Sequence, residues 1–224
     1  MKRWLPYLII ASVALITLAA GMVLYRTQKA PTLTATPEAA KPLTAETSQT
    51  PNPSQAPLAT FVAIEEFGDF QCPPCRMLSE PLNEIVRDFG DKVRLTFRHF
   101  PLDKHLNARR ASQAAEAARL QQHFWEMHHL LYQEQELWSK ASTPDGLFVG
   151  YALKLGLDPA KFRQDMDSAE VNERISGDEA RAATLGVSMT PTVFVNGKSL
   201  NLARGPASVR DAVEAEMAKA PGQP

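Results

Sequence analysis

The stretch EFGDFQCPPC at residues 66–75 holds both cysteines of the chain and joins a β-rich run to a helical one. Residues 61–67 read as a strand, and Gly68-Asp69 is a turn signal. From Met77 to Phe89 the apolar residues recur at helical spacing, and residues 93–98 alternate like a second strand. Strand, helix and strand within residues 61–98 predict a βαβ unit with a right-handed crossover.

The chain after this unit reads as helical and then returns to strands. Five helical stretches without an intervening strand predict an all-helical insert over about residues 103–186. A strand follows at Thr192–Val195, with the hairpin signal Asn196-Gly197, a returning strand at Ser199–Ala203 and a final helix at Val209–Ala218. The expected order is therefore β-α-β, a helical insert, and β-β-α.

A Cys-x-x-Cys motif between a strand and a helix has a specific chemical use. The first cysteine, Cys72, occupies the helix N-cap, where unpaired backbone N–H groups and the helix dipole favour an anion. Its thiolate is thereby stabilised and becomes the attacking sulfur. Cys75 lies over the same turn and can close the ring or resolve a mixed disulfide.

The two prolines between the cysteines modify this expectation. Pro73 at the first helical position does not destabilise the helix, because a backbone N–H at that position would have no partner within the helix. Pro74 removes a donor that could have faced the thiolate, and neither residue adds a positive charge. We therefore expect Cys72 to be less acidic than in a Cys-Pro-His-Cys site, and its disulfide to be less oxidising.

Two simpler interpretations of the cysteine pair stay open. The pair can be a structural disulfide, although its place between a strand and an amphipathic helix disfavours this. A metal site would need further ligands, and all the histidines follow the second strand, in the link or the insert: His99, His105, His123, His128 and His129. We expect neither a metal nor a cofactor at the site.

Four separated motifs resemble the DsbA-like thioredoxin-fold proteins, and the BdbD-type branch in particular. The first is the segment at residues 66–75, and the second is RHFPL at residues 98–102 with His105. Segments AAEAA at 114–118 and FWEMH at 124–128 resemble the first two helices of that branch's insert. Residues 186–197, GVSMTPTVFVNG, match its cis-proline loop and hairpin. The resemblance covers about residues 59–219.

This resemblance implies an α/β thioredoxin fold, with a central mixed sheet, interrupted by an α-helical domain. It implies that Cys72 is the exposed nucleophile and Cys75 the more buried resolving thiol. Pro191 would be a cis-proline beside the disulfide, and Thr190 would line the substrate-peptide site. Glu66 matches a buried acid that relays protons to the resolving cysteine, with a surface charge at a strand end as the alternative.

Two segments precede the predicted domain at residues 58–224. Residues 4–25 carry no charge and follow Lys2-Arg3, and at about 1.5 Å per residue they would span a bilayer core as a helix. We favour a membrane anchor over residues 1–25, with a cleavable signal peptide as the alternative. Residues 26–57 contain 21 Pro, Thr, Ala or Ser among 32 residues, a composition typical of a disordered linker.

Composition and charge exclude some classes of protein and of binding partner. Two cysteines cannot form a disulfide scaffold, and a formal net charge of −1 gives no basic bias toward nucleic acid. We expect an extracytoplasmic thiol:disulfide oxidoreductase, tethered to the membrane on the periplasmic side or secreted, which forms disulfides in unfolded exported proteins. It would be reoxidised by a membrane redox partner, quinone-linked or reductant-linked.

Three rivals follow from the same residues. The first is a reductase or isomerase kept reduced by a membrane electron donor, since Pro74 leaves the direction of electron flow open. The second is a thiol-based copper or zinc binding module. The third is a redox-inert, peptide-binding chaperone.

Overall fold

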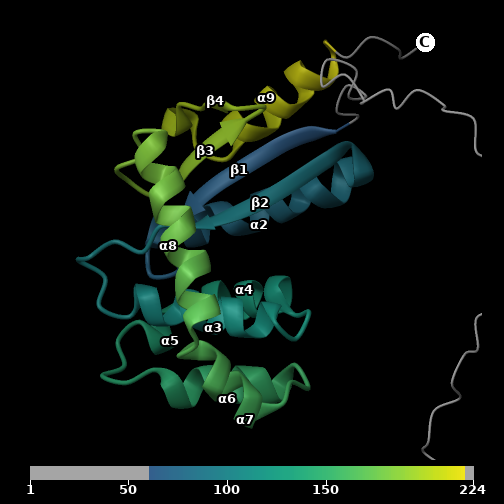
Figure 1. Ribbon diagram of the computed structural model, residues 1–224. Coiled ribbons are helices and arrows are strands. Elements are labelled where there is room, and N and C mark those ends of the chain that lie inside the picture. The colour runs from purple at the N-terminus through teal and green to yellow at the C-terminus, as the bar shows by residue number, and fades with distance from the viewer. Residues whose placement is uncertain (1–60, 220–224) are drawn as a thin grey trace, which may run out of the picture. The chain divides into compact units, whose positions relative to one another are not determined.

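The computed structural model describes residues 61–219, so the expected anchor at 1–25 and linker at 26–57 lie outside the described residues. Within residues 61–219 no helix is long and apolar enough to span a bilayer. The first half of the described chain contains β1 (Val62–Gly68), α2 (Pro73–Phe89), β2 (Val93–His99), α3 (Ala108–Arg119) and α4 (Phe124–Gln133). It continues with α5 (Gln135–Trp138), α6 (Asp145–Lys154), α7 (Pro159–Met166), α8 (Ala169–Thr184), β3 (Thr192–Val195), β4 (Lys198–Ser199) and α9 (Ala207–Met217) (Figure 1).

The four strands form one mixed sheet in the order β2-β1-β3-β4. β1 pairs in parallel with β2, with Val62 opposite Val93, which confirms the predicted βαβ unit. β1 also pairs antiparallel with β3, with Ile64 opposite Val195. Because β1 is central, its carboxyl end, where the cysteine loop begins, lies beside both β2 and β3. The fold is the predicted α/β thioredoxin fold with a helical insert.

Helices cover both faces of the sheet. Leu78, Leu82 and Ile85 of α2 recur on one side of that helix and pack with Val62, Ile64 and Val93. Val209 and Val213 of α9 belong to the same apolar cluster, so α2 and α9 share a face. On the other face, Ala182 of α8 packs with Phe67 and Phe194. This sandwich fixes the axis of α2, and therefore the direction in which its N-terminus points.

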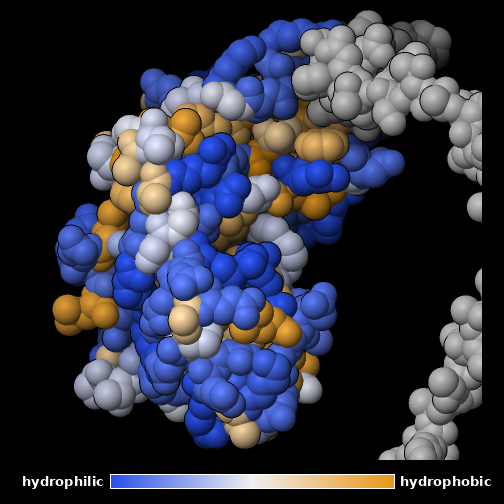
Figure 2. All heavy atoms as spheres, in the orientation of Figure 1, coloured by the Kyte–Doolittle hydropathy of each residue, from blue (hydrophilic) through white to orange (hydrophobic). Residues whose placement is uncertain are grey.

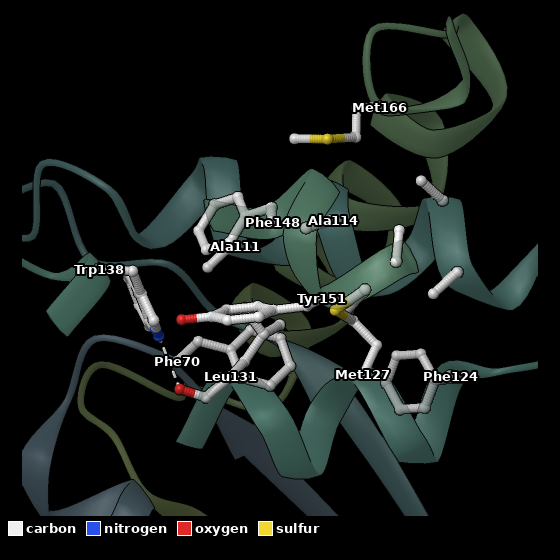
Figure 3. Packing of buried hydrophobic residues seen from close by; sticks show 14 of the residues in the cluster. Phe70, Ala111, Ala114, Phe124, Met127, Leu131, Trp138, Phe148, Tyr151 and Met166 are labelled. Atoms are coloured by element: carbon white, nitrogen blue, oxygen red, sulfur yellow. Dashed lines mark hydrogen bonds between the residues drawn. The ribbon is translucent and has the colours of Figure 1, made fainter. Parts of the chain in front are cut away.

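The helical insert has its own apolar core, which continues up to the cysteines. Figure 3 shows the buried rings of Phe148, Tyr151 and Phe124 around Met127 and Leu131. Trp138 is fully buried, and its indole N–H donates to the Leu131 carbonyl at 2.7 Å (Figure 3). Cys72, Cys75 and Phe70 belong to the same cluster. The insert is thus packed directly against the cysteine loop.

Two expectations about elements were wrong in detail. In the described chain the insert contains six helices rather than five, because the four-residue α5 separates α4 from α6. The returning strand expected at Ser199–Ala203 is only Lys198–Ser199. Asn201 ends it early, because its side chain accepts from the Ala203 N–H at 2.8 Å and starts a 3-10 turn at Leu202–Arg204.

Candidate active site

Cys72 is the N-cap of α2, as the sequence predicts. Its backbone is extended, with φ −79° and ψ 119°, and its N–H donates to the Asp69 carbonyl at 3.0 Å. Pro73 and Pro74 occupy the first two helical positions. The loop turns between the end of β1 and the start of α2, so the Cys72 sulfur lies where the N–H groups of the first helical turn converge.

The two thiols are electrostatically distinct. The pKa of Cys72 is lowered to about 6 by the Cys75 thiol, by its contact with Thr190 and by the Cys75 backbone N–H, while burial and the Asp69 charge oppose this. Burial and the Cys72 sulfur raise the pKa of Cys75 well above its ordinary value. In the reduced protein, Cys72 is therefore the thiolate at neutral pH and Cys75 the thiol.

The expected accessibility of Cys72 needs a correction. The resemblance implied an exposed nucleophile, but Cys72 is only 5% exposed and Cys75 is fully buried. The loop that contains Thr190 covers part of Cys72. The Thr190 carbonyl lies 3.5 Å from the Cys72 sulfur. Cys72 is the less buried of the pair, and it lines the adjacent surface cavity.

Thr190 and Pro191 come from the other end of the chain. The Thr190–Pro191 peptide bond is cis, and Pro191 immediately precedes β3. Because β3 pairs with β1, this loop lies beside the cysteine loop that follows β1. The structure thus brings Cys72, Cys75, Thr190 and Pro191 to one end of the sheet.

Glu66 lies inside the fold rather than on its surface. Its side chain is 1% exposed, and Oε1 has no hydrogen-bond partner among residues 61–219. Burial and the nearby Cys72 sulfur raise the pKa of Glu66 to about 8. The surface alternative is therefore wrong. Glu66 is a protonated acid at neutral pH, and its negative charge, once it ionises, contributes to the raised pKa of the nearby Cys75 thiol.

Sequence reasoning missed the polar side chains that hold the cysteine loop. Gln135 of α5 donates from Nε2 to the carbonyls of Phe70 at 2.7 Å and Cys72 at 3.1 Å. Gln71 accepts from the Asn107 N–H at 2.8 Å. Asp69 is fully buried and binds three donors. Only the Gly68-Asp69 turn signal pointed to this part of the chain, and single glutamines in a helical sequence carry no such signal.

A surface cavity of about 460 Å³ opens next to Cys72. The link between β2 and α3 forms one wall and the cis-proline loop another, and the lining residues are Cys72, Pro73, Pro74, Leu102, Asp103, Lys104, His105, Ser188, Met189 and Thr190. Met189, which lines the cavity, is a large apolar side chain at 66% exposure, and Leu106, which follows the lining residue His105 in the chain, is 92% exposed. Figure 2 shows hydrophobic atoms on the projecting loop between β2 and α3.

The sequence model of the Thioredoxin family matches residues 56–215 of this chain. Curated relatives are Na⁺/H⁺ antiporters of the NhaA type. One from Mycolicibacterium gilvum is 39% identical over 142 residues, which are 61% of this chain and 22% of the antiporter. One from Salinispora arenicola is 40% identical over 147 residues, 65% of this chain and 21% of the antiporter. The chain spans only about a fifth of the length of these relatives.

Solved structures of thiol–disulfide proteins share the fold. A thioredoxin-like oxidoreductase from Silicibacter pomeroyi is 27% identical, with a TM-score of 0.60, over 72% of this chain and 90% of that one. Oxidised BdbD from Bacillus subtilis is 24% identical, with a TM-score of 0.63, over 70% and 88%. The likeness to BdbD shows the fold alone. With the family match and the paired cysteines at the helix N-terminus, these likenesses show that the chain belongs to the Thioredoxin family and shares the fold of thiol–disulfide oxidoreductases.

Proposed function

We propose that this protein forms disulfide bonds in exported proteins. The observation that carries the proposal is the stabilised Cys72 thiolate, with its pKa lowered to about 6, next to a Cys75 thiol that stays protonated. A stabilised Cys72 thiolate stabilises the reduced enzyme. The Cys72–Cys75 disulfide is therefore easily reduced, and so it readily oxidises substrate thiols.

The proposed reaction has two exchange steps. A substrate thiolate attacks Cys72 Sγ, a new S–S bond forms, the Cys72–Cys75 bond breaks, and Cys75 leaves and takes up a proton. Glu66, protonated at neutral pH in the reduced protein, is the group proposed to relay that proton. A second substrate thiolate then attacks the substrate sulfur of the mixed disulfide, and Cys72 leaves as the stabilised thiolate. The substrate is oxidised by two electrons and the Cys72–Cys75 pair is reduced.

The roles of the neighbouring groups follow from their positions. Thr190, which lines the cavity, and Pro191, joined to it by the cis peptide bond, would bind the substrate backbone beside Cys72. Exposed Met189 and Leu106 would contact apolar segments of unfolded chains. These are the chemical features of a site for an extended, partly folded polypeptide.

The proposal also covers the side of the membrane on which the catalytic domain acts. The charge-free run at residues 4–25 supports an anchor or a signal, and residues 26–57 support a linker to the domain at 58–224. The catalytic domain would then act on the extracytoplasmic side and be reoxidised by a membrane redox partner.

One observation supports the alternative of a reductase or isomerase. Pro74 supplies neither an N–H donor nor a positive charge to Cys72, so the thiolate has fewer stabilising partners than in a Cys-Pro-His-Cys site. The redox potential separates the two functions. It is measured by equilibrating the protein with mixtures of reduced and oxidised glutathione.

We expect a potential less negative than about −220 mV, the more oxidising end of the cytosolic glutathione range. A potential at or below about −270 mV, the thioredoxin value, would assign electron flow to the reducing direction. Cys72→Ser must also abolish oxidation of a reduced test protein. If that variant still turned over, the mechanism above would be wrong.

A further inference from the structure

Asp69 is a buried carboxylate one turn before the nucleophilic cysteine. Its side chain is fully buried, and Oδ1 accepts from the Gln71 N–H at 2.7 Å. Oδ2 accepts from the Leu102 N–H at 2.9 Å and lies 2.7 Å from His105 Nδ1. Of the three partners, only His105 can carry a positive charge. A buried carboxylate is costly unless it is paired and hydrogen-bonded, so its state depends on His105.

His105 connects this buried carboxylate to the active-site cavity. Its side chain is 17% exposed, and it lines the cavity into which Cys72 opens. Because Asp69 is an acceptor, His105 Nδ1 carries a proton whether the ring is neutral or charged. The charge of the ring therefore depends on Nε2, the nitrogen that Asp69 does not hold.

The charges around the Asp69–His105 pair determine how His105 can affect the ionisation of Cys72. The negative charge of Asp69 raises the pKa of Cys72, against the partners that lower it. Ser188, Met189 and Thr190 on the opposite wall carry no ionisable side chain. The other ionisable groups near the pair are Asp103 and Lys104 on the link, Glu66 and Cys75 beneath the loop, and Tyr132 of α4, whose hydroxyl donates to the Asp69 carbonyl at 3.5 Å.

We propose that His105 is a positioning residue for the Cys72 thiolate, because its imidazolium, held by Asp69, supplies the positive charge that Cys-Pro-Pro-Cys lacks. In many sites such a charge stands between the cysteines; here it comes from the link between β2 and α3. The proposal rests on the proposed function only in taking Cys72 as the attacking sulfur, and it is independent of the direction of electron flow.

The test is the pH titration of Cys72 in the reduced full-length protein, followed by ultraviolet absorbance of the thiolate. In His105→Asn, the amide nitrogen can keep the hydrogen bond to Asp69 but cannot carry a charge. We expect the midpoint of Cys72 to rise by roughly one pH unit, so that the thiolate fraction at pH 6 falls about fivefold.

The retained hydrogen bond separates the effect of charge from that of loop position. If His105 only held the loop in place, His105→Asn would keep that hydrogen bond and leave the midpoint of Cys72 unchanged. An unchanged midpoint in His105→Asn therefore overturns the proposal. No substrate is involved, so a redox potential in the reducing range would refute the proposed function and leave this test unaffected.

Discussion

Gln135 donates a hydrogen bond from Nε2 to the carbonyl of Cys72, at 3.1 Å, across the boundary between the insert and the thioredoxin unit. The same nitrogen donates to the Phe70 carbonyl at 2.7 Å. Gln135, Cys72 and Phe70 are all buried. One amide group thus supplies the donor for the buried Phe70 carbonyl and a second donor for the Cys72 carbonyl, which also accepts from the Arg76 N–H at 3.2 Å. The insert is consequently part of the support for the nucleophile, as well as a wall next to the substrate cavity.

The first prediction concerns this amide. Gln135→Leu keeps the volume and removes the amide, which leaves the buried Phe70 carbonyl unpaired and the Cys72 carbonyl with the Arg76 N–H alone. We expect a loss of about 1–3 kcal/mol in the free energy of unfolding, measured by urea denaturation. Gln164→Leu is the matched control, because Gln164 is an exposed glutamine in α7. Equal stabilities of the two variants would contradict a supporting role for Gln135.

The second prediction concerns the reactivity of the two thiols. Because the pKa of Cys72 is lowered to about 6, its alkylation by iodoacetamide should reach half its maximal rate near pH 6. Cys75, buried and with a raised pKa, should stay unmodified over that range. Mass spectrometry of the alkylated peptides distinguishes the two sites.

A pair of substitutions tests why the pKa of Cys72 is low. The largest lowering contribution is the hydrogen bond from the Cys75 thiol. Cys75→Ala removes this donor, so the alkylation midpoint should rise. Cys75→Ser keeps a hydroxyl donor at the same position and should raise it less. The reverse order of the two variants would show that another contact dominates.

The third prediction uses the raised pKa of Glu66. The folded value is about 8 and the ordinary value is 4.5, so the unfolded carboxyl ionises first as pH rises. The contribution of Glu66 to stability is therefore fully present below about pH 4.5 and is lost as pH rises through 8. We expect Glu66→Gln to be more stable than the wild type at pH 8, by on the order of 2 kcal/mol, with a smaller difference at pH 4.5.

Urea unfolding of the reduced protein at these two pH values measures the effect. Glu84→Gln, which changes an exposed glutamate of α2, is the control and should leave the pH dependence unaltered. If wild type and Glu66→Gln showed parallel pH profiles, Glu66 would be ionised in the folded protein.

The fourth prediction concerns the buried Glu116 of α3. It lies 2.7 Å from His99 Nε2 and accepts from Arg119 and Arg174 at 2.8 and 2.7 Å, so it joins α3 to β2 and α8. Burial alone would raise its pKa, but His99 and Arg119 lower it to about 2. We expect Glu116→Gln to lose about 2–3 kcal/mol of stability at pH 7, as breaking a buried ion pair does.

The pH dependence of this loss has a definite sign. A carboxylate with a lowered folded pKa contributes stability that is present above its ordinary value of 4.5 and disappears as pH falls toward 2. The difference between wild type and Glu116→Gln should therefore shrink in acid. Glu173→Gln, at an exposed position of α8, should match the wild type throughout.

The sequence predicted the elements whose patterns are local. The apolar spacing of α2 and the alternation in β2 gave their positions closely, because one buried face decides each pattern. The N-cap position of Cys72 followed from the strand and helix on either side of it. The four-residue α5 was missed because a single turn carries no full period, although this turn supplies Gln135.

Contacts distant in sequence were beyond this reasoning. The burial of Cys72 depends on Thr190, 118 positions later, and the burial of Glu66 depends on the packing of the central strand. Asp69 looked like an ordinary turn residue, because its three partners come from the cysteine loop and from a link some 33 to 36 residues further along. The resemblance supplied the cis-proline loop and left this carboxylate without a role.

The order of the sheet has a consequence for a chain still being synthesised. β3 follows β1 by more than 120 residues, yet it is the strand that places Thr190 against Cys72. Until the ribosome has released residues 190–195, the βαβ unit can form with its cysteine pair uncovered on one side. A nascent chain in that state would present a reactive dithiol before it had a substrate site, so premature mixed disulfides should concentrate in translation products that end within the helical insert.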